Sequence, residues 1–257
     1  DVRRMLMTIK AIAEGSRSLV YFASQHLDIA EYSENTKAKE GAEQLLSLIT
    51  PICKGFLTEL GVEAANLGLQ VLGGHGYIRE SGMEQNVRDS RISTIYEGTT
   101  GIQALDLLGR KVLGSRTKLL QPLLKSLFDY ARSLQRHQSM CWCVAPLNEA
   151  LQIWQSCTAT VADSAVGDAD EVGAAAHDYL MISGYAMLAY LWARMASVAE
   201  HKMADGCLDE SFYRAKIHTA QFYFKRILPR IYTHNAALRS GASVLMGLDA
   251  DDLQLNS

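Results

Sequence analysis

Proline is scarce in this chain, and that scarcity restricts the folds that the chain can adopt. The 257 residues contain only four prolines, at positions 51, 122, 146 and 229. Because proline disrupts helix interiors and is common in the turns of β-rich folds, its rarity favours long helices over an all-β sandwich. The sequence also lacks an alternating β-like segment of convincing length, so we predict an all-α fold.

Apolar residues recur at helical spacing from one end of the sequence to the other. The first such segment covers residues 3–29, where Met5, Ile9, Ile12 and Leu19 share one face. Before Gly114, the pattern predicts further helices from residue 39 onward with a kink or restart at Pro51, over 60–72, over 83–92, and from just after 97 to 113. After Gly114, it predicts helices at 117–137, 146–166, 171–203, 209–229 and 232–246. We read residues 31–39 as a polar loop, and divide the chain into two packed helical modules, residues 1–114 and 115–257.

Charge and cysteine content narrow the function classes. The 25 Lys and Arg residues nearly balance the 28 Asp and Glu residues, and no dense basic run is present, which argues against nucleic-acid binding. The five cysteines are odd in number and scattered, as in a reduced, cytoplasmic protein. No uninterrupted apolar run reaches the ~20 residues of a membrane span. Four histidines are spread over separate predicted elements, so we predict no metal site: His177, His201, His218 and His234.

A glycine-rich turn follows the predicted helix 60–72. The residues from Gly73 to Gly76 read Gly-Gly-His-Gly, which should end the helix. Glycines expose main-chain N–H groups that can donate hydrogen bonds to anionic oxygens. On the glycines alone, an ordinary turn between helices is the favoured reading. This is no dinucleotide-binding fingerprint, because a strand would have to precede the glycines.

A second conspicuous segment reads Ile95-Tyr96-Glu97-Gly98-Thr99. Glu97 can simply favour the positive end of the helix that follows it. It can also act as a catalytic base, if an apolar setting raises its affinity for a proton. The residues alone leave both readings open.

Together the two segments resemble the C-terminal helical domain of the acyl-CoA dehydrogenases, which are FAD-dependent flavoproteins. The family couples a Gln-x-x-Gly-Gly-x-Gly-Tyr turn to an Arg-Asp pair and then to Ile-Tyr-Glu-Gly-Thr, and the same elements occur here in order at 70–77, 88–89 and 95–99. This resemblance covers residues 1–114. Residues 115–257 resemble the extra C-terminal helical module of longer members, including the bacterial methylthiopropionyl-CoA dehydrogenase type.

The resemblance implies an oxidoreductase that converts an acyl-CoA to the trans-2-enoyl-CoA, as in fatty-acid β-oxidation. A base removes the proton alpha to the thioester while a hydride leaves the beta carbon for FAD, and an electron-transfer flavoprotein is the expected acceptor. The family's base falls on Glu97, Gly98 leaves space beside the thioester, and Thr99 matches a position that hydrogen-bonds FAD. The turn matches residues that contact FAD held by a neighbouring subunit, which implies a homo-oligomer; these are Gln70, Val71, Leu72, Gly73 and Gly74.

Some expectations qualify this assignment. Gly101 stands where many relatives carry a glutamine that touches FAD, and we predict that Arg88, Asp89 and Arg91 form buried ion pairs that orient the segment. The family's middle β-domain and its Arg-x-Thr-Phe-Gly loop have no counterpart in this sequence, so the chain alone should bind no flavin and be inactive. The alternative is a non-catalytic relative that serves assembly, regulation or DNA protection, but the retained Glu97 and the balanced charge favour the enzyme.

Overall fold

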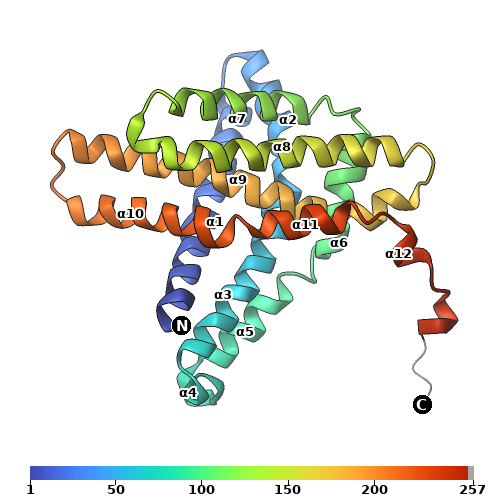
Figure 1. The fold of residues 1–257 in the computed structure, drawn as a ribbon, viewed down its shortest axis with the longest axis horizontal. Coiled ribbons are helices and arrows are strands. Elements are labelled where there is room, and N and C mark those ends of the chain that lie inside the picture. Colours follow the sequence, from blue (N-terminus) through green and yellow to red (C-terminus); the bar gives the residue numbers. More distant parts are fainter. Residues whose placement is uncertain (254–257) are drawn as a thin grey trace.

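The computed structural model describes residues 1–253, and every regular element within that range is helical, so the predicted all-α fold is confirmed (Figure 1). The label η marks short 3₁₀ or π segments. The elements before Gly114 are α1 Val2–Tyr32, α2 Thr36–Pro51, η1 Ile52–Phe56, α3 Leu57–Val71, α4 Gly74–Tyr77, η2 Arg79–Ser81, α5 Met83–Ile92, α6 Thr100–Leu105 and η3 Asp106–Leu113. Those after it are α7 Leu120–Leu134, η4 Gln138–Met140, α8 Cys141–Ser164, α9 Asp170–Ala204, α10 Glu210–Phe222, η5 Tyr223–Ile227, α11 Arg230–Leu238, α12 Ser243–Met246 and η6 Ala250–Leu253.

Residues 36–71 form one uninterrupted helical rod rather than separate helices. Pro51 ends α2 without breaking the rod, and the next five residues, η1, have π-helical hydrogen bonding. A proline has no N–H to donate, so a wider turn next to it lets the helix continue. The predicted loop 31–39 is also shorter than expected, because α1 extends to Tyr32 and Asn35 caps α2 by accepting a hydrogen bond from Ala38 N at 3.2 Å.

Helix α9 is the centre of the molecule. It packs against α1, α6, α8, α10 and α11, and its middle is buried on every side, from Tyr179 to Ala193. A helix enclosed in this way needs apolar side chains all round, which explains its dense run of aromatic and Met residues. The run packs in the core, since six of its large side chains are buried: Tyr179, Met181, Tyr185, Met187, Tyr190 and Trp192.

The core runs across the predicted boundary at Gly114. One cluster of buried side chains includes Leu19, Phe56 and Leu108 from the first range and Trp154 and Trp192 from the second. The two ranges therefore share a core, and their division into two modules stays a prediction.

A helical hairpin projects from this body (Figure 1). Helices α3 and α5 lie side by side, and α4 joins them at the far tip. Since the helices of a hairpin run in opposite directions, the end of α5 returns to the body beside the start of α3. Both segments that the sequence singled out lie at ends of this hairpin.

By length and composition, one helix of the described residues is able to cross a membrane, namely the rod Thr36–Val71. The rod is not the unbroken apolar run that we looked for in the sequence, because polar residues interrupt its apolar stretch. Within the structure, 39% of the rod's most apolar stretch is buried, and buried core helices meet the same criterion. The finding is therefore weak evidence for a membrane span.

Candidate functional site

The glycine-rich turn forms the tip of the hairpin. Helix α3 ends at Val71, and Gly73 takes a φ of +58° and a ψ of −139°, which L side chains rarely adopt. The expected end of the helix is therefore present, and Gly74–Tyr77 then form a separate single helical turn, α4. Only glycine fits at position 76, because a Cβ there would lie 2.2 Å from the carbonyl oxygen of Leu69 on α3. This close approach lets the turn α4 pack directly against the end of α3.

The rest of the turn faces open space. A Cβ built on Gly73 or Gly74 would meet no atom within 4 Å. Gln70, Leu72 and both glycines are exposed, and Val71 is half-buried. The tip thus presents open main chain to whatever binds there, and packing within the described residues does not require a glycine at position 74.

The loop that carries Glu97 lies between α5 and α6. Glu97 has a φ of +55° and Gly98 a φ of +90°, so two successive residues occupy the left-handed region that non-glycine residues seldom enter. The Glu97 side chain is exposed. Thr99 then caps α6, and its Oγ1 accepts a hydrogen bond from Ile102 N at 3.4 Å.

Lys54 fastens this loop to the rod. From the π segment η1, its Nζ donates to the carbonyl oxygens of Ser93 at 2.7 Å and Gly98 at 2.8 Å, one on each side of Glu97. The same ammonium lies 5.6 Å from the centre of the Tyr96 ring. Sequence reasoning missed Lys54, although a lone lysine in the apolar stretch after Pro51 was a signal that something nearby satisfies its charge.

Two more side chains hold the ends of the loop. Gln103 Nε2 donates to the carbonyl oxygen of Glu97 at 3.2 Å. Thr100 is buried, and its Oγ1 donates to Glu59 Oε1 on α3 at 2.6 Å. The main-chain conformation of Glu97 is thus fixed from η1, α3 and α6.

The predicted ion pairs on α5 do not form. Arg88, Asp89 and Arg91 are all exposed, and among the described residues none of them is in an ion pair. Arg91 instead donates from Nη1 to the hydroxyl of the buried Thr94. These three residues face solvent, so the burial that was expected for the ion pairs is missing.

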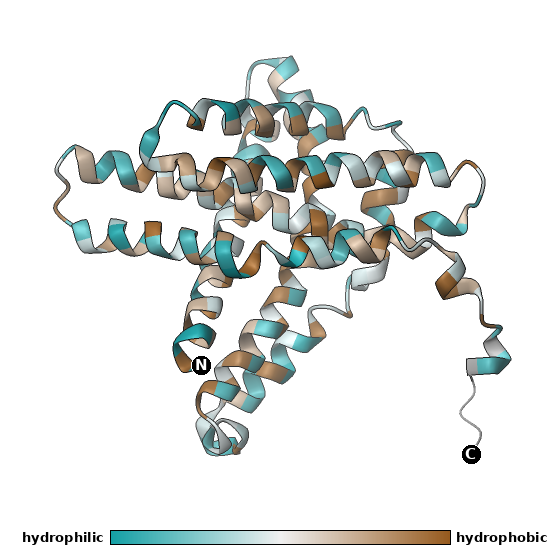
Figure 2. Cartoon of the chain, viewed as in Figure 1, coloured by the Kyte–Doolittle hydropathy of each residue, from teal (hydrophilic) through white to brown (hydrophobic). Residues whose placement is uncertain are grey.

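The turn and the Glu97 loop lie at opposite ends of α5. A helix of this length separates its ends by about 15 Å at 1.5 Å per residue. The structure therefore brings Glu97, Gly98 and Thr99 together but keeps Gln70–Gly74 apart from them. Large apolar side chains are exposed around both places, and hydrophobic residues recur along the hairpin (Figure 2). They are Leu72, Tyr77, Ile78, Ile92, Ile95, Tyr96, Ile102 and Leu105.

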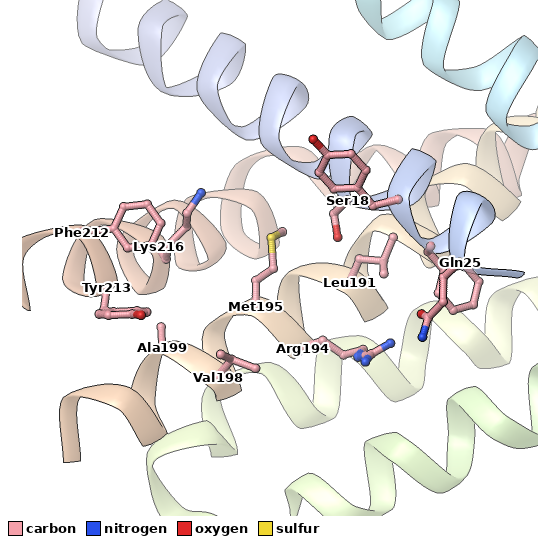
Figure 3. A pocket seen from close by; sticks show the side chains of 12 residues that line it. Ser18, Gln25, Leu191, Arg194, Met195, Val198, Ala199, Phe212, Tyr213 and Lys216 are labelled. Atoms are coloured by element: carbon pink, nitrogen blue, oxygen red, sulfur yellow. The ribbon is translucent and has the colours of Figure 1, made fainter. Parts of the chain in front are cut away.

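A separate groove of about 360 Å³ lies between α1, α9 and α10 (Figure 3). Apolar and aromatic side chains line most of it, together with the cations Arg194 and Lys216. None of the residues predicted for the site lines this groove, so the predicted chemistry belongs to the exposed hairpin instead.

The histidines do not all lie apart. His177 and Asp178 on α9 meet His234 on α11, and one possible ligand atom from each residue lies within 4.8 Å of the others. The inference that separate elements disfavour a shared metal site therefore does not hold for this trio, because α9 and α11 pack against each other.

Comparison with known families covers nearly the whole chain. Residues 1–113 match the family described as acyl-CoA dehydrogenase, C-terminal domain. Residues 125–249 match the family described as acetyl-CoA dehydrogenase C-terminal like.

Individual relatives agree with these matches. Over 95% of its length the chain is 34% identical to 3-methylmercaptopropionyl-CoA dehydrogenase of Ruegeria pomeroyi. Over its full length it is 32% identical to the broad-specificity linear acyl-CoA dehydrogenase FadE5 of Mycobacterium tuberculosis, and it spans 42% of the length of each of these relatives. The crystal structure of Caenorhabditis elegans ACDH-11 in complex with C11-CoA has a similar fold, with a TM-score of 0.59 over 84% of this chain and 34% of that one, at 20% identity.

Proposed function

The chain belongs to the acyl-CoA dehydrogenase family, and from this we propose that the enzyme carrying it oxidises an acyl-CoA thioester to the trans-2-enoyl-CoA, with Glu97 as the base. The observation that supports this most is the left-handed main chain of Glu97, held by Lys54 and Gln103. An unfavourable conformation of this kind costs on the order of 1 kcal/mol or more, and is kept where the surrounding contacts over-determine it, often at reacting groups.

Glu97 offers two groups to the substrate. Its carboxylate, exposed on the loop, accepts the proton alpha to the thioester carbonyl. Its main-chain N–H makes no hydrogen bond within residues 1–253, so it is free to donate to the thioester oxygen as negative charge develops there. A donor fixed in place before the reaction stabilises that charge without reorganising.

Gly98 and Thr99 complete the loop. The φ of +90° at Gly98 suits glycine, and a Cβ there would lie 2.9 Å from Gln103 Nε2, so the missing side chain leaves room for the hydrogen bond from Gln103 to Glu97. In this proposal the thioester lies beside Gly98. The Thr99 hydroxyl accepts the cap hydrogen bond of α6, and it keeps its own proton available for a cofactor oxygen.

The described residues are compatible with FAD. The tip of the hairpin offers uncovered main chain at Gly73 and Gly74, where no atom stands within 4 Å of an added Cβ, next to exposed Gln70 and Leu72. A flat aromatic cofactor also suits the exposed apolar side chains around the loop, such as Ile95 and Tyr96. When bound, FAD supplies the hydride acceptor.

The surroundings of the site are part of the same proposal. Exposed apolar side chains over the whole hairpin are expected to be covered by further polypeptide, including a neighbouring subunit of a homo-oligomer that shares the FAD at the tip. We assign the enzyme to the cytoplasm, with an electron-transfer flavoprotein as its acceptor and no nucleic-acid partner.

The test is Glu97→Gln in the complete enzyme. The variant should retain FAD and bind acyl-CoA, yet lose turnover by on the order of a hundredfold or more, because the amide cannot take the proton. Glu40→Gln, an exposed change on α2 outside the hairpin, is the matched control and should leave turnover unchanged. Turnover of Glu97→Gln within a few-fold of the parent would show that the base lies elsewhere.

A further inference from the structure

Helices α9 and α11 bring three metal-binding side chains to one place outside the proposed active site. His234 Nδ1 and Asp178 Oδ1 are 2.7 Å apart, so they share a hydrogen bond and form an ion pair when the imidazole is protonated. The His177 ring centre lies 6.3 Å from that of His234. One possible ligand atom of each residue lies within 4.8 Å of the others.

We propose that His177, Asp178 and His234 bind a divalent transition-metal ion, Zn²⁺ being the first candidate, and that the ion links α9 to α11. Two imidazoles with one carboxylate are a common donor set for such ions. Zn²⁺ bonds nitrogen and oxygen at about 2.0–2.2 Å, so its tetrahedral ligands stand about 3.4 Å apart. The possible ligand atoms of the trio, within 4.8 Å of one another, are already close to that spacing.

The His234 imidazole is already held in place. Its ring stacks on that of Tyr185, with centroids 5.8 Å apart and planes at 28°, and Asp178 holds its Nδ1. Both His234 and Asp178 are about one-fifth exposed, while His177 is exposed. The site is therefore ordered on its inner side and open on its outer side, where water can supply the fourth ligand.

The nearest cation on α11 does not oppose a metal ion strongly. Arg230, one helical turn before His234, donates from Nη1 and Nη2 to both carboxylate oxygens of Glu63 at 2.6 Å. Because that carboxylate offsets the guanidinium charge, the repulsion at the trio is reduced.

Metal titration of the chelator-treated protein tests the proposal. Calorimetry with Zn²⁺ should show one ion per chain, and Co²⁺ should give the visible absorption bands of a low-coordinate site with nitrogen ligands. His177→Ala removes an exposed ligand that makes no hydrogen bond among the described residues, so it should fold normally and bind Zn²⁺ at least tenfold more weakly. Asp178→Asn should weaken binding to a similar extent, because a neutral amide is a poor ligand for Zn²⁺.

Two controls make the outcome decisive. His218→Ala, at an exposed position on α10, should bind Zn²⁺ as the parent does. His137 and His201 form a second pair, with ring centroids 5.4 Å apart, so His201→Ala should also leave the affinity unchanged. Absence of stoichiometric binding in the parent, unchanged affinity in His177→Ala, or loss of binding in His201→Ala alone would each overturn the proposal.

Discussion

Lys54 and Gly98 are 44 residues apart in sequence, yet the Lys54 ammonium donates to the Gly98 carbonyl oxygen at 2.8 Å. The same ammonium donates to the carbonyl oxygen of Ser93, so it joins the two sides of the loop that carries Glu97. A charged donor satisfies both carbonyls at once, and this keeps the left-handed Glu97 main chain in place. Placement of the proposed base therefore depends on a residue of the rod, outside the motif itself.

Lys54→Met should loosen this loop. The change keeps the length of the side chain but leaves both carbonyls without their charged donor, at an expected cost of about 1–3 kcal/mol of unfolding free energy. In the complete enzyme, kcat should fall on the order of tenfold or more because the base and its N–H lose their position. Hydrogen exchange of residues 93–99 and steady-state rates give the two readouts.

Lys37→Met is the control for that experiment, since Lys37 is exposed at the start of the same rod. It should change neither exchange nor rate. If hydrogen exchange of residues 93–99 in Lys54→Met is as slow as in the parent, the hydrogen bonds of Lys54 do not hold the loop.

The turn at the hairpin tip separates cofactor binding from folding. Gly74→Val places its side chain in open space, so the melting temperature should stay within a few degrees while flavin content of the complete enzyme falls. Gly76→Val instead forces a Cβ against the Leu69 carbonyl oxygen, 2.2 Å away, and should destabilise the hairpin itself. Flavin-to-protein absorbance ratios and melting curves measure the two effects. Full flavin occupancy in Gly74→Val would mean that the turn only connects two helices.

Local patterns predicted the helices but not how they join. The helix predicted over 83–92 matches α5, Met83–Ile92, because its residues follow a helical pattern between two turns. The rod through Pro51 did not follow from the pattern, because packing against α1 and α9 decides whether a proline restarts a helix or is absorbed by a π segment. Regular spacing carries no information about that packing.

The candidate site shows the same limit. Glu97 and the glycine turn stand out because each motif is contiguous in sequence. Lys54 stands out only as a charge in an apolar stretch, and its partner Ser93, 39 residues away, cannot be identified from the neighbouring sequence. The error over Arg88, Asp89 and Arg91 has a related cause, since a charge pattern does not reveal which face of α5 meets α3. His177 and His234 lie on different helices, so nothing in the sequence indicates that they are close. The packing of α9 against α11 places their ring centres 6.3 Å apart.

An ion pair between α1 and α10 should make stability depend on pH. Burial alone would raise the pKa of Glu14, but hydrogen bonds from Lys10 and Lys216 lower it overall. A carboxyl whose pKa is lower in the folded state stabilises the fold above its ordinary pKa of 4.5, and this contribution disappears as pH falls through the folded value.

Glu14→Gln should therefore lower the unfolding free energy by up to about 1 kcal/mol at pH 7. The difference from the parent should shrink as pH is lowered below 4.5. Urea unfolding at several pH values measures it, and Glu43→Gln, an exposed change on α2, should give no pH-dependent difference. If the difference in unfolding free energy between the parent and Glu14→Gln stays constant down to acid pH, the explanation by charge is wrong.

Replacing either of two glycines of α9 by alanine should have different effects on the unfolding free energy, a decrease at Gly184 and no change or an increase at Gly173. A Cβ on Gly184 would lie 2.2–2.4 Å from three ring carbons of Phe56, which is fully buried. Overpacking of this kind costs about 1–3 kcal/mol, more than the ~1 kcal/mol that alanine gains over glycine in a helix. Gly173, near the start of the same helix, has no atom within 4 Å of its Cβ position, so Gly173→Ala should be neutral or stabilising.

A double-mutant cycle attributes the effect to the contact between Gly184 and Phe56. Phe56→Ala alone should destabilise by about 3–5 kcal/mol through the cavity that it leaves. Adding Gly184→Ala to that variant should cost much less than it does alone, because the ring that opposed the new methyl group is gone. Denaturant unfolding of the four proteins gives the coupling energy. Equal costs of Gly184→Ala with and without the Phe56 ring would mean that α9 and η1 do not approach each other as closely as this contact requires.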